Sequence, residues 1–180
     1  MSSKYQVMIE TDHDTFIRDI TTAFPVETQE LVLKLHQRLM DAGFKFEATS
    51  RRFSSTGYFL LYAPKRKKIE DIWVIKIMPD DCVIRFDSKN ASQYADVIER
   101  FPSFLLDIIT NGDGCIYNPA PEKCHIESNG QMFTIDGMEY TKCNSKCCAA
   151  CDFWIPLTGL TSEKSQAIEK WVALELAYLT

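Results

Sequence analysis

The sequence predicts an α+β protein, with an antiparallel sheet of about four strands covered by helices, then a C-terminal Cys-rich hairpin module and a final helix. Three observations predict it: helical spacing up to residue 43, short β-type runs over residues 44–86, and six of seven cysteines after residue 114. A chain of 180 residues has room for one domain and a small appended module. We therefore expect an α+β domain at 1–112 and a Cys-rich module with the C-terminal helix at 113–180.

The first part of the chain has the pattern of two helices. Asp12 or Asp14 can cap a short helix before Pro25, which interrupts it. Apolar residues then recur at helical spacing from about residue 27 to 42, and Gly43 stands where a left-handed C-cap is needed. These features predict two consecutive helices.

The spacing of the apolar residues changes from a helical to a strand-like pattern after Gly43. Short runs rich in aromatic and β-branched residues, separated by polar or proline-containing turns, occupy residues 44–48, 57–63, 72–78 and 82–86. In the third run, Trp73, Ile75 and Ile77 form an apolar face, and the alternate positions are mixed. These runs predict a meander of antiparallel strands.

Helices return in the second half of the chain. Ser88 or Asn90 can cap one that reaches Phe101, and Pro102 suits the first turn of the next, which ends at Asn111-Gly112. A hairpin is expected at 132–141 around Asp136-Gly137, followed by strand-like residues 152–156 and a last helix from residue 161 or 162 toward 179.

Composition narrows the possible partners. The net charge of −5 argues against general attraction to nucleic acid. We expect the basic stretches Arg51-Arg52 and 65–68 to be solvated loops, with an anion- or nucleic-acid-binding patch as the alternative. No secretory signal or membrane-spanning run is apparent, which predicts a cytoplasmic protein without membrane contact. In a reducing cytosol, clustered cysteines favour a metal site over disulfides.

The cysteines have the spacing Cys115-x8-Cys124-x18-Cys143-x3-Cys147-Cys148-x2-Cys151. A structural zinc ion needs four tetrahedral ligands, usually two close pairs separated by a hairpin. Cys115 and Cys124 can supply one pair, and Cys143 with Cys147, Cys148 or Cys151 the other. The sequence thus predicts a structural Zn²⁺ site among these six residues, and His125 is a further candidate ligand.

Two alternatives stay open for this segment. Cys148-Ala149-Ala150-Cys151 has the spacing of a thiol-dependent oxidoreductase, although strand-like residues follow it instead of the helix that lowers a thiol pKa in such enzymes. The cysteines can also be reduced residues of no special role. The other two histidines, His13 and His36, are expected on the surface, with His36 on the polar side of its helix.

The chain resembles an uncharacterised family of small bacterial α+β proteins with a C-terminal cysteine-rich segment. The resemblance is carried by Phe133-Thr134-Ile135-Asp136-Gly137, Tyr140, Lys142-Cys143, Pro119 and Cys124, and the run from Cys147 to Cys151 departs from the family pattern. The resemblance implies the fold outline and the cysteine segment but no activity. The cysteine pattern leads us to expect a noncatalytic module that binds an unknown protein or small-molecule ligand, because four or more thiolates tend to close the zinc shell.

Overall fold

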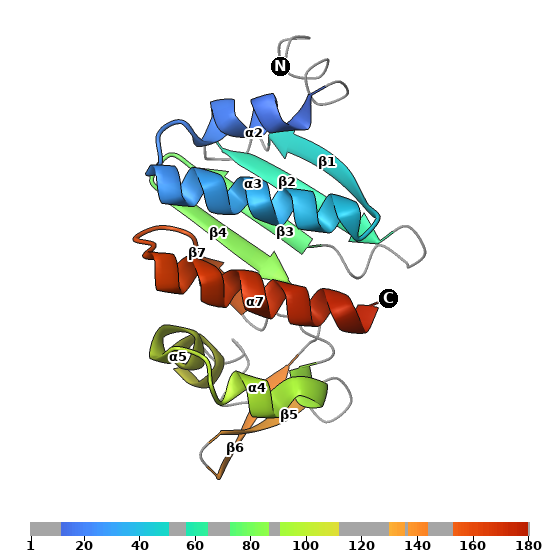
Figure 1. The fold of residues 1–180 in the computed structure, drawn as a ribbon, viewed down its shortest axis with the longest axis vertical. Helices are drawn as coiled ribbons and strands as arrows, with labels where there is room; N and C mark the ends of the chain where they lie inside the picture. Colours follow the sequence, from blue (N-terminus) through green and yellow to red (C-terminus); the bar gives the residue numbers. More distant parts are fainter. Residues whose placement is uncertain are drawn as a thin grey trace, which may run out of the picture.

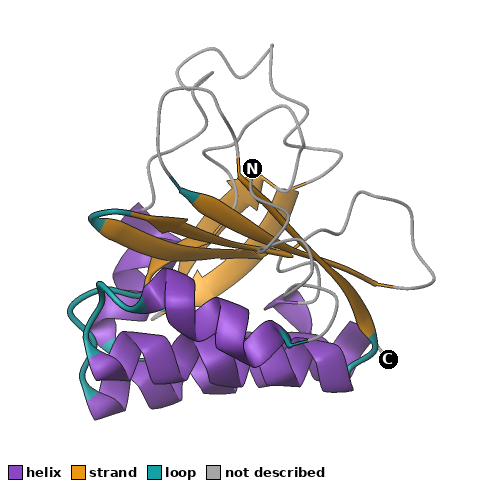
Figure 2. Cartoon of the chain, turned by 90° about the horizontal axis from the view of Figure 1, so that it is seen from above, coloured by secondary structure: helices purple, strands orange, loops and turns teal. Residues whose placement is uncertain are grey.

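A five-stranded antiparallel sheet lies at the centre of the computed structural model, with helices on one of its faces (Figures 1 and 2). The structure describes residues 12–50, 57–64, 73–86, 91–111, 130–135, 137–143 and 153–179. The predicted α+β class is confirmed. The basic stretches at 51–52 and 65–68 lie outside the described residues.

The first four strands form the predicted meander, with the bounds β1 Phe44–Ser50, β2 Tyr58–Pro64, β3 Trp73–Met78 and β4 Asp81–Phe86. A fifth strand, β7 (Phe153–Pro156), pairs antiparallel with β4, with Ile155 opposite Ile84. The sheet therefore has the order β1-β2-β3-β4-β7, one strand more than expected. Residues 153–156 have a strand-like sequence, but nothing local identifies a partner almost 70 residues away.

Within residues 12–43, two helices precede the sheet, as predicted. The helix α2 (His13–Thr21) begins after Asp12, whose carboxylate accepts a hydrogen bond from the Thr15 amide at 3.1 Å. The next helix, α3 (Val26–Asp41), ends before Gly43, whose φ of +82° is the left-handed conformation expected there. The capping and stop residues thus set both helix boundaries.

The region after the meander differs from the prediction in one respect. The first expected helix is only a 3₁₀ turn, η2 (Ala91–Tyr94), and one α-helical turn, α4 (Ala95–Ile98). The chain then turns, with the Phe101 amide donating to the Ile98 carbonyl at 2.8 Å, and α5 (Ser103–Asn111) follows. Pro102 disfavours a helical conformation at Phe101, which explains the early break.

The predicted hairpin forms a separate two-stranded sheet of β5 (Gly130–Ile135) and β6 (Met138–Cys143). Gly137 has a φ of +75°, in agreement with the predicted turn. Ile135 is buried, and β5 contacts η2 and α4. Figure 1 shows the hairpin beyond α7, on the side away from α3.

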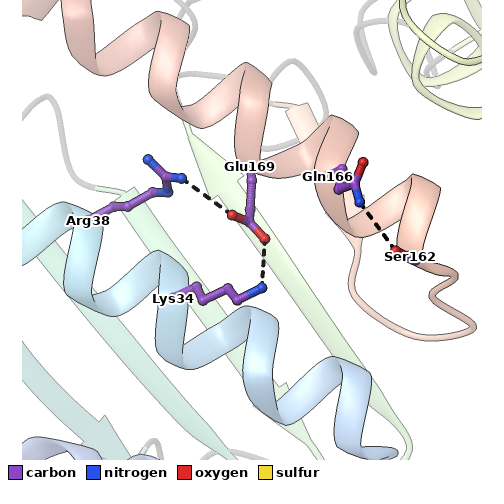
Figure 3. Close-up of polar contacts among 5 residues, drawn as sticks. All are labelled: Lys34, Arg38, Ser162, Gln166 and Glu169. Atoms are coloured by element: carbon purple, nitrogen blue, oxygen red, sulfur yellow. Dashed lines mark hydrogen bonds and ion pairs between the residues drawn. The ribbon is translucent and has the colours of Figure 1, made fainter.

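The last helix, α7 (Ser162–Leu179), packs against α3. The Glu169 carboxylate lies 3.3 Å from both the Lys34 ammonium and the Arg38 guanidinium across this contact (Figure 3). Gln166 and Ser162 form a hydrogen bond within α7 in the same view. The division at residue 112 stays a prediction, and the β4–β7 and α3–α7 contacts join elements from the two sides of it.

Candidate functional site

The hairpin carries the one predicted zinc ligand that the described part of the chain contains. Cys143 is the last residue of β6 and lies opposite Gly130, the first residue of β5. Cys115, Cys124, Cys147, Cys148 and Cys151 lie outside the described residues, as does His125. The described elements next to these residues in the chain are α5, β5, β6 and β7.

Those elements arrange the ends of the cysteine-bearing segments. The Gly130–Cys143 pair is the open end of the hairpin, so the segment before β5 and the segment after β6 both start from this pair. At their other ends, the first segment leaves α5 and the second enters β7, and α5 contacts β7.

The strand β7 is relevant to the thiol-oxidoreductase alternative. It begins at Phe153, two residues after Cys151, and pairs with β4 in the main sheet. A reactive dithiol normally has its first cysteine at the N-terminus of a helix, whose dipole stabilises the thiolate. Here the described residues after the motif form a strand, as the sequence predicted.

A second polar group lies between α3 and the sheet, and here the prediction for His36 was wrong. His36 is 2% exposed, and its Nδ1 lies 3.0 Å from the Tyr62 hydroxyl of β2, itself fully buried. The residue follows Val32 and Thr28 at four-residue spacing, on the face of α3 that packs against the core. This spacing could have predicted a buried position for His36. We instead expected it on the surface because histidine is a polar residue.

The environment of His36 sets its charge. Burial, and to a lesser degree the charge of His13, lower the pKa of His36 from 6.5 to about 4, against the opposing effect of Asp14. Burial also raises the pKa of the Tyr62 hydroxyl well above 10. Both groups are therefore neutral at pH 7.

Two further rings complete this cluster. The His13 ring, at the start of α2, is half-buried and packs edge-on against the His36 ring with the centroids 5.4 Å apart. Phe46 of β1 contacts both, with centroid distances of 4.6 Å to His13 and 4.9 Å to His36. We call His13, His36, Phe46 and Tyr62 the histidine cluster. His13 thus contacts a buried partner and is not a simple surface residue.

A third buried polar group joins α7 to η2. Glu175 is fully buried and accepts a hydrogen bond from the Tyr94 hydroxyl, which also accepts one from Trp171 Nε1 at 3.2 Å. Trp171 and Glu175 are one helical turn apart on α7, and both side chains are fully buried. These bonds fix α7 against the region that contacts the hairpin.

Metal and membrane features were also sought in the described residues. Within the described ranges, no three His, Cys, Asp or Glu side chains converge as metal ligands. Among the helices there, none has the length and apolar character needed to cross a bilayer.

No protein-family model, curated protein or solved structure matches the chain. The resemblance based on the hairpin sequence stays a prediction.

Proposed function

We propose that this protein is a noncatalytic binding module whose Cys-rich segment is held by a structural zinc ion. The observation that carries the proposal is the Gly130–Cys143 pair, from which both cysteine-bearing segments start. Structural zinc modules commonly take ligands from both sides of a hairpin in this way. In this proposal the partner is an unknown protein or a small-molecule ligand.

Chain length supports convergence of the thiols. Cys124 comes six residues before Gly130, so its Cα lies within about 20 Å of this end of the hairpin. Cys147 follows Cys143 by four residues, a limit of about 14 Å. Both limits are wide enough for one zinc ion near Cys143 to receive thiolates from the two sides. Cys115, Cys148 and Cys151 remain candidates for the other positions.

The chemistry of the ligands supports a structural role over a catalytic one. Four thiolates fill the tetrahedral shell of zinc, whereas catalytic zinc keeps a position for water and usually has histidine or carboxylate ligands. The strand that follows Cys151 weighs against redox use of Cys148 and Cys151. Zinc binding in such a segment contributes directly to its folding free energy.

Matched cysteine variants test the metal part of the proposal. We expect Cys143→Ser to lower the zinc content of purified protein, and Cys82→Ala to leave it unchanged, because Cys82 is buried in β4 within the main sheet. Equal zinc contents in the two variants would contradict the assignment of Cys143.

An insulin-reduction assay tests the noncatalytic part. We expect the parent protein not to accelerate the reduction of insulin by an added dithiol. Activity that disappears in Cys148→Ser, with the zinc content unchanged, would show that the protein is an oxidoreductase and overturn this part of the proposal. Cys82→Ala, which removes a thiol outside the Cys-rich segment, serves as the control.

A further inference from the structure

We propose that His13 and His36 form a second metal site, separate from the cysteines, in which a divalent transition-metal ion is held between the two imidazoles. The site is built on α2 and α3, which contact each other and lie side by side in Figure 1. It involves none of the cysteines, so it does not depend on the proposed structural zinc.

The first observation concerns Nε2, the second ring nitrogen of the buried His36 side chain. Its Nδ1 is occupied by the Tyr62 hydroxyl, and the described residues supply no hydrogen-bond partner for Nε2. This holds in both tautomers: Nε2 either carries a proton without an acceptor or presents a bare lone pair. A buried polar atom without a partner normally costs stability, so such an atom indicates a missing ligand.

The second observation is the spacing of the two rings. A metal–nitrogen bond of about 2 Å and a tetrahedral angle place the centroids of two imidazoles on one ion about 5 Å apart. The observed separation between His13 and His36 is 5.4 Å. The interplanar angle of 84° is compatible with this, because each ring can turn about its own metal–nitrogen axis.

The surroundings of His36 match those of a metal ligand. Metal-binding histidines usually donate the second ring N–H to an oxygen, which fixes the tautomer and the ring orientation. The Tyr62 hydroxyl, 3.0 Å from Nδ1, is placed to accept that bond and leave the Nε2 lone pair for the ion.

The second ligand is held at the more accessible side of the cluster. His13 directly follows the Asp12 cap of α2, and its half-buried ring packs on Phe46. Imidazole nitrogen suits Zn²⁺, Ni²⁺ and Cu²⁺, and two such ligands leave positions for water or for an oxygen or nitrogen donor from a bound molecule.

Histidine-detected NMR separates this site from the thiolates. Zn²⁺ is titrated into the full chain while the ring nitrogens of all three histidines are followed. We expect His13 and His36 to shift together in one saturable step, with the Nδ1–H tautomer of His36. His13→Ala should abolish the His36 shift, and His125→Ala should leave it intact. Tyr62→Phe should weaken binding about 10- to 100-fold through loss of the positioning hydrogen bond.

Three results would overturn the proposal. They are an unshifted His36 in the presence of excess Zn²⁺, a His36 shift that survives in His13→Ala, and saturation only at millimolar zinc. The first result would mean that the rings make only an aromatic contact. Because the readout is the imidazole nitrogens, failure here is distinct from failure of the cysteines to bind zinc.

Discussion

His36 couples protonation to folding at the scale of a single residue. Its pKa is about 4 in the folded protein and 6.5 for the free side chain, so the unfolded chain binds a proton more readily between these values. Its contribution to stability is complete above pH 6.5 and is lost as the pH falls toward 4. A shift of this size corresponds to about 3 kcal/mol.

The variant His36→Gln tests this coupling, because glutamine can still bond to the Tyr62 hydroxyl and does not titrate. Between pH 6.5 and 4, we expect the parent to lose about 3 kcal/mol more unfolding free energy than the variant does. The measurement is urea denaturation across this range without added metal. Equal pH slopes for parent and variant would show that His36 is not buried as the structure has it.

Cys82 provides a test at a second residue. Burial, reinforced by Asp81, raises the pKa of the Cys82 thiol to about 12, so almost no thiolate exists at neutral pH. We expect a thiol reagent to leave Cys82 unmodified in the native protein after zinc has been chelated, and to modify it in denaturant. Peptide mapping identifies the labelled residues. Labelling of Cys82 as fast as Cys143 would contradict its burial in β4.

At the scale of elements, Gly57, the residue directly before β2, lies in close contact with the end of β3. A Cβ at this position would meet the Met78 side chain and lie 2.7 Å from the Ile77 carbonyl oxygen. The backbone atom cannot move without disturbing the strand pairing, so we expect Gly57→Ala to cost about 1–3 kcal/mol.

Denaturation of Gly57→Ala beside Asp80→Ala checks this prediction. Asp80 lies exposed in the turn between β3 and β4, so its substitution should change stability by less than about 0.5 kcal/mol. If both variants had the same stability as the parent, this result would contradict the close contact between Gly57 and the end of β3.

The boundaries of the elements could be predicted from the sequence more readily than their long-range contacts. Local chemistry predicted the α2 cap, the Gly43 stop and the turn at Gly137, because each depends on neighbouring residues. The pairing of β7 with β4 depends on contacts distant in sequence, and no local pattern identified it. His36 was misassigned because its residue type outweighed its helical position. The cysteine spacing predicts a metal site, but which thiols converge is set by segments outside the described residues.

At the scale of the whole molecule, α7 connects the main sheet to the hairpin side. Its Glu169 pairs with α3, and its Trp171 and Glu175 bond to Tyr94 in η2, which contacts β5. The sheet has its own extensive core, with Leu60, Tyr62, Trp73, Ile75 and Ile84 nearly inaccessible to solvent. We therefore expect the sheet to survive loss of the metal.

Hydrogen exchange after zinc chelation tests whether the main sheet stays folded when the hairpin loses the metal. Amides of β5 and β6 should lose protection, because the metal stabilises the segment around them, while amides of β3 and β4 should keep theirs. Cys143→Ser should reproduce the loss without a chelator, and Cys82→Ala should not. Uniform loss of protection across both sheets would indicate a single cooperative unit.

The central claim is a structural zinc ion held by the cysteines, and elemental analysis of protein purified without added metal tests it most directly. Together with thiol titration, the account predicts about one zinc per chain and four protected thiols besides Cys82, all four released by a chelator. Less than about 0.3 zinc per chain, with every thiol outside the sheet freely reactive, would contradict the account.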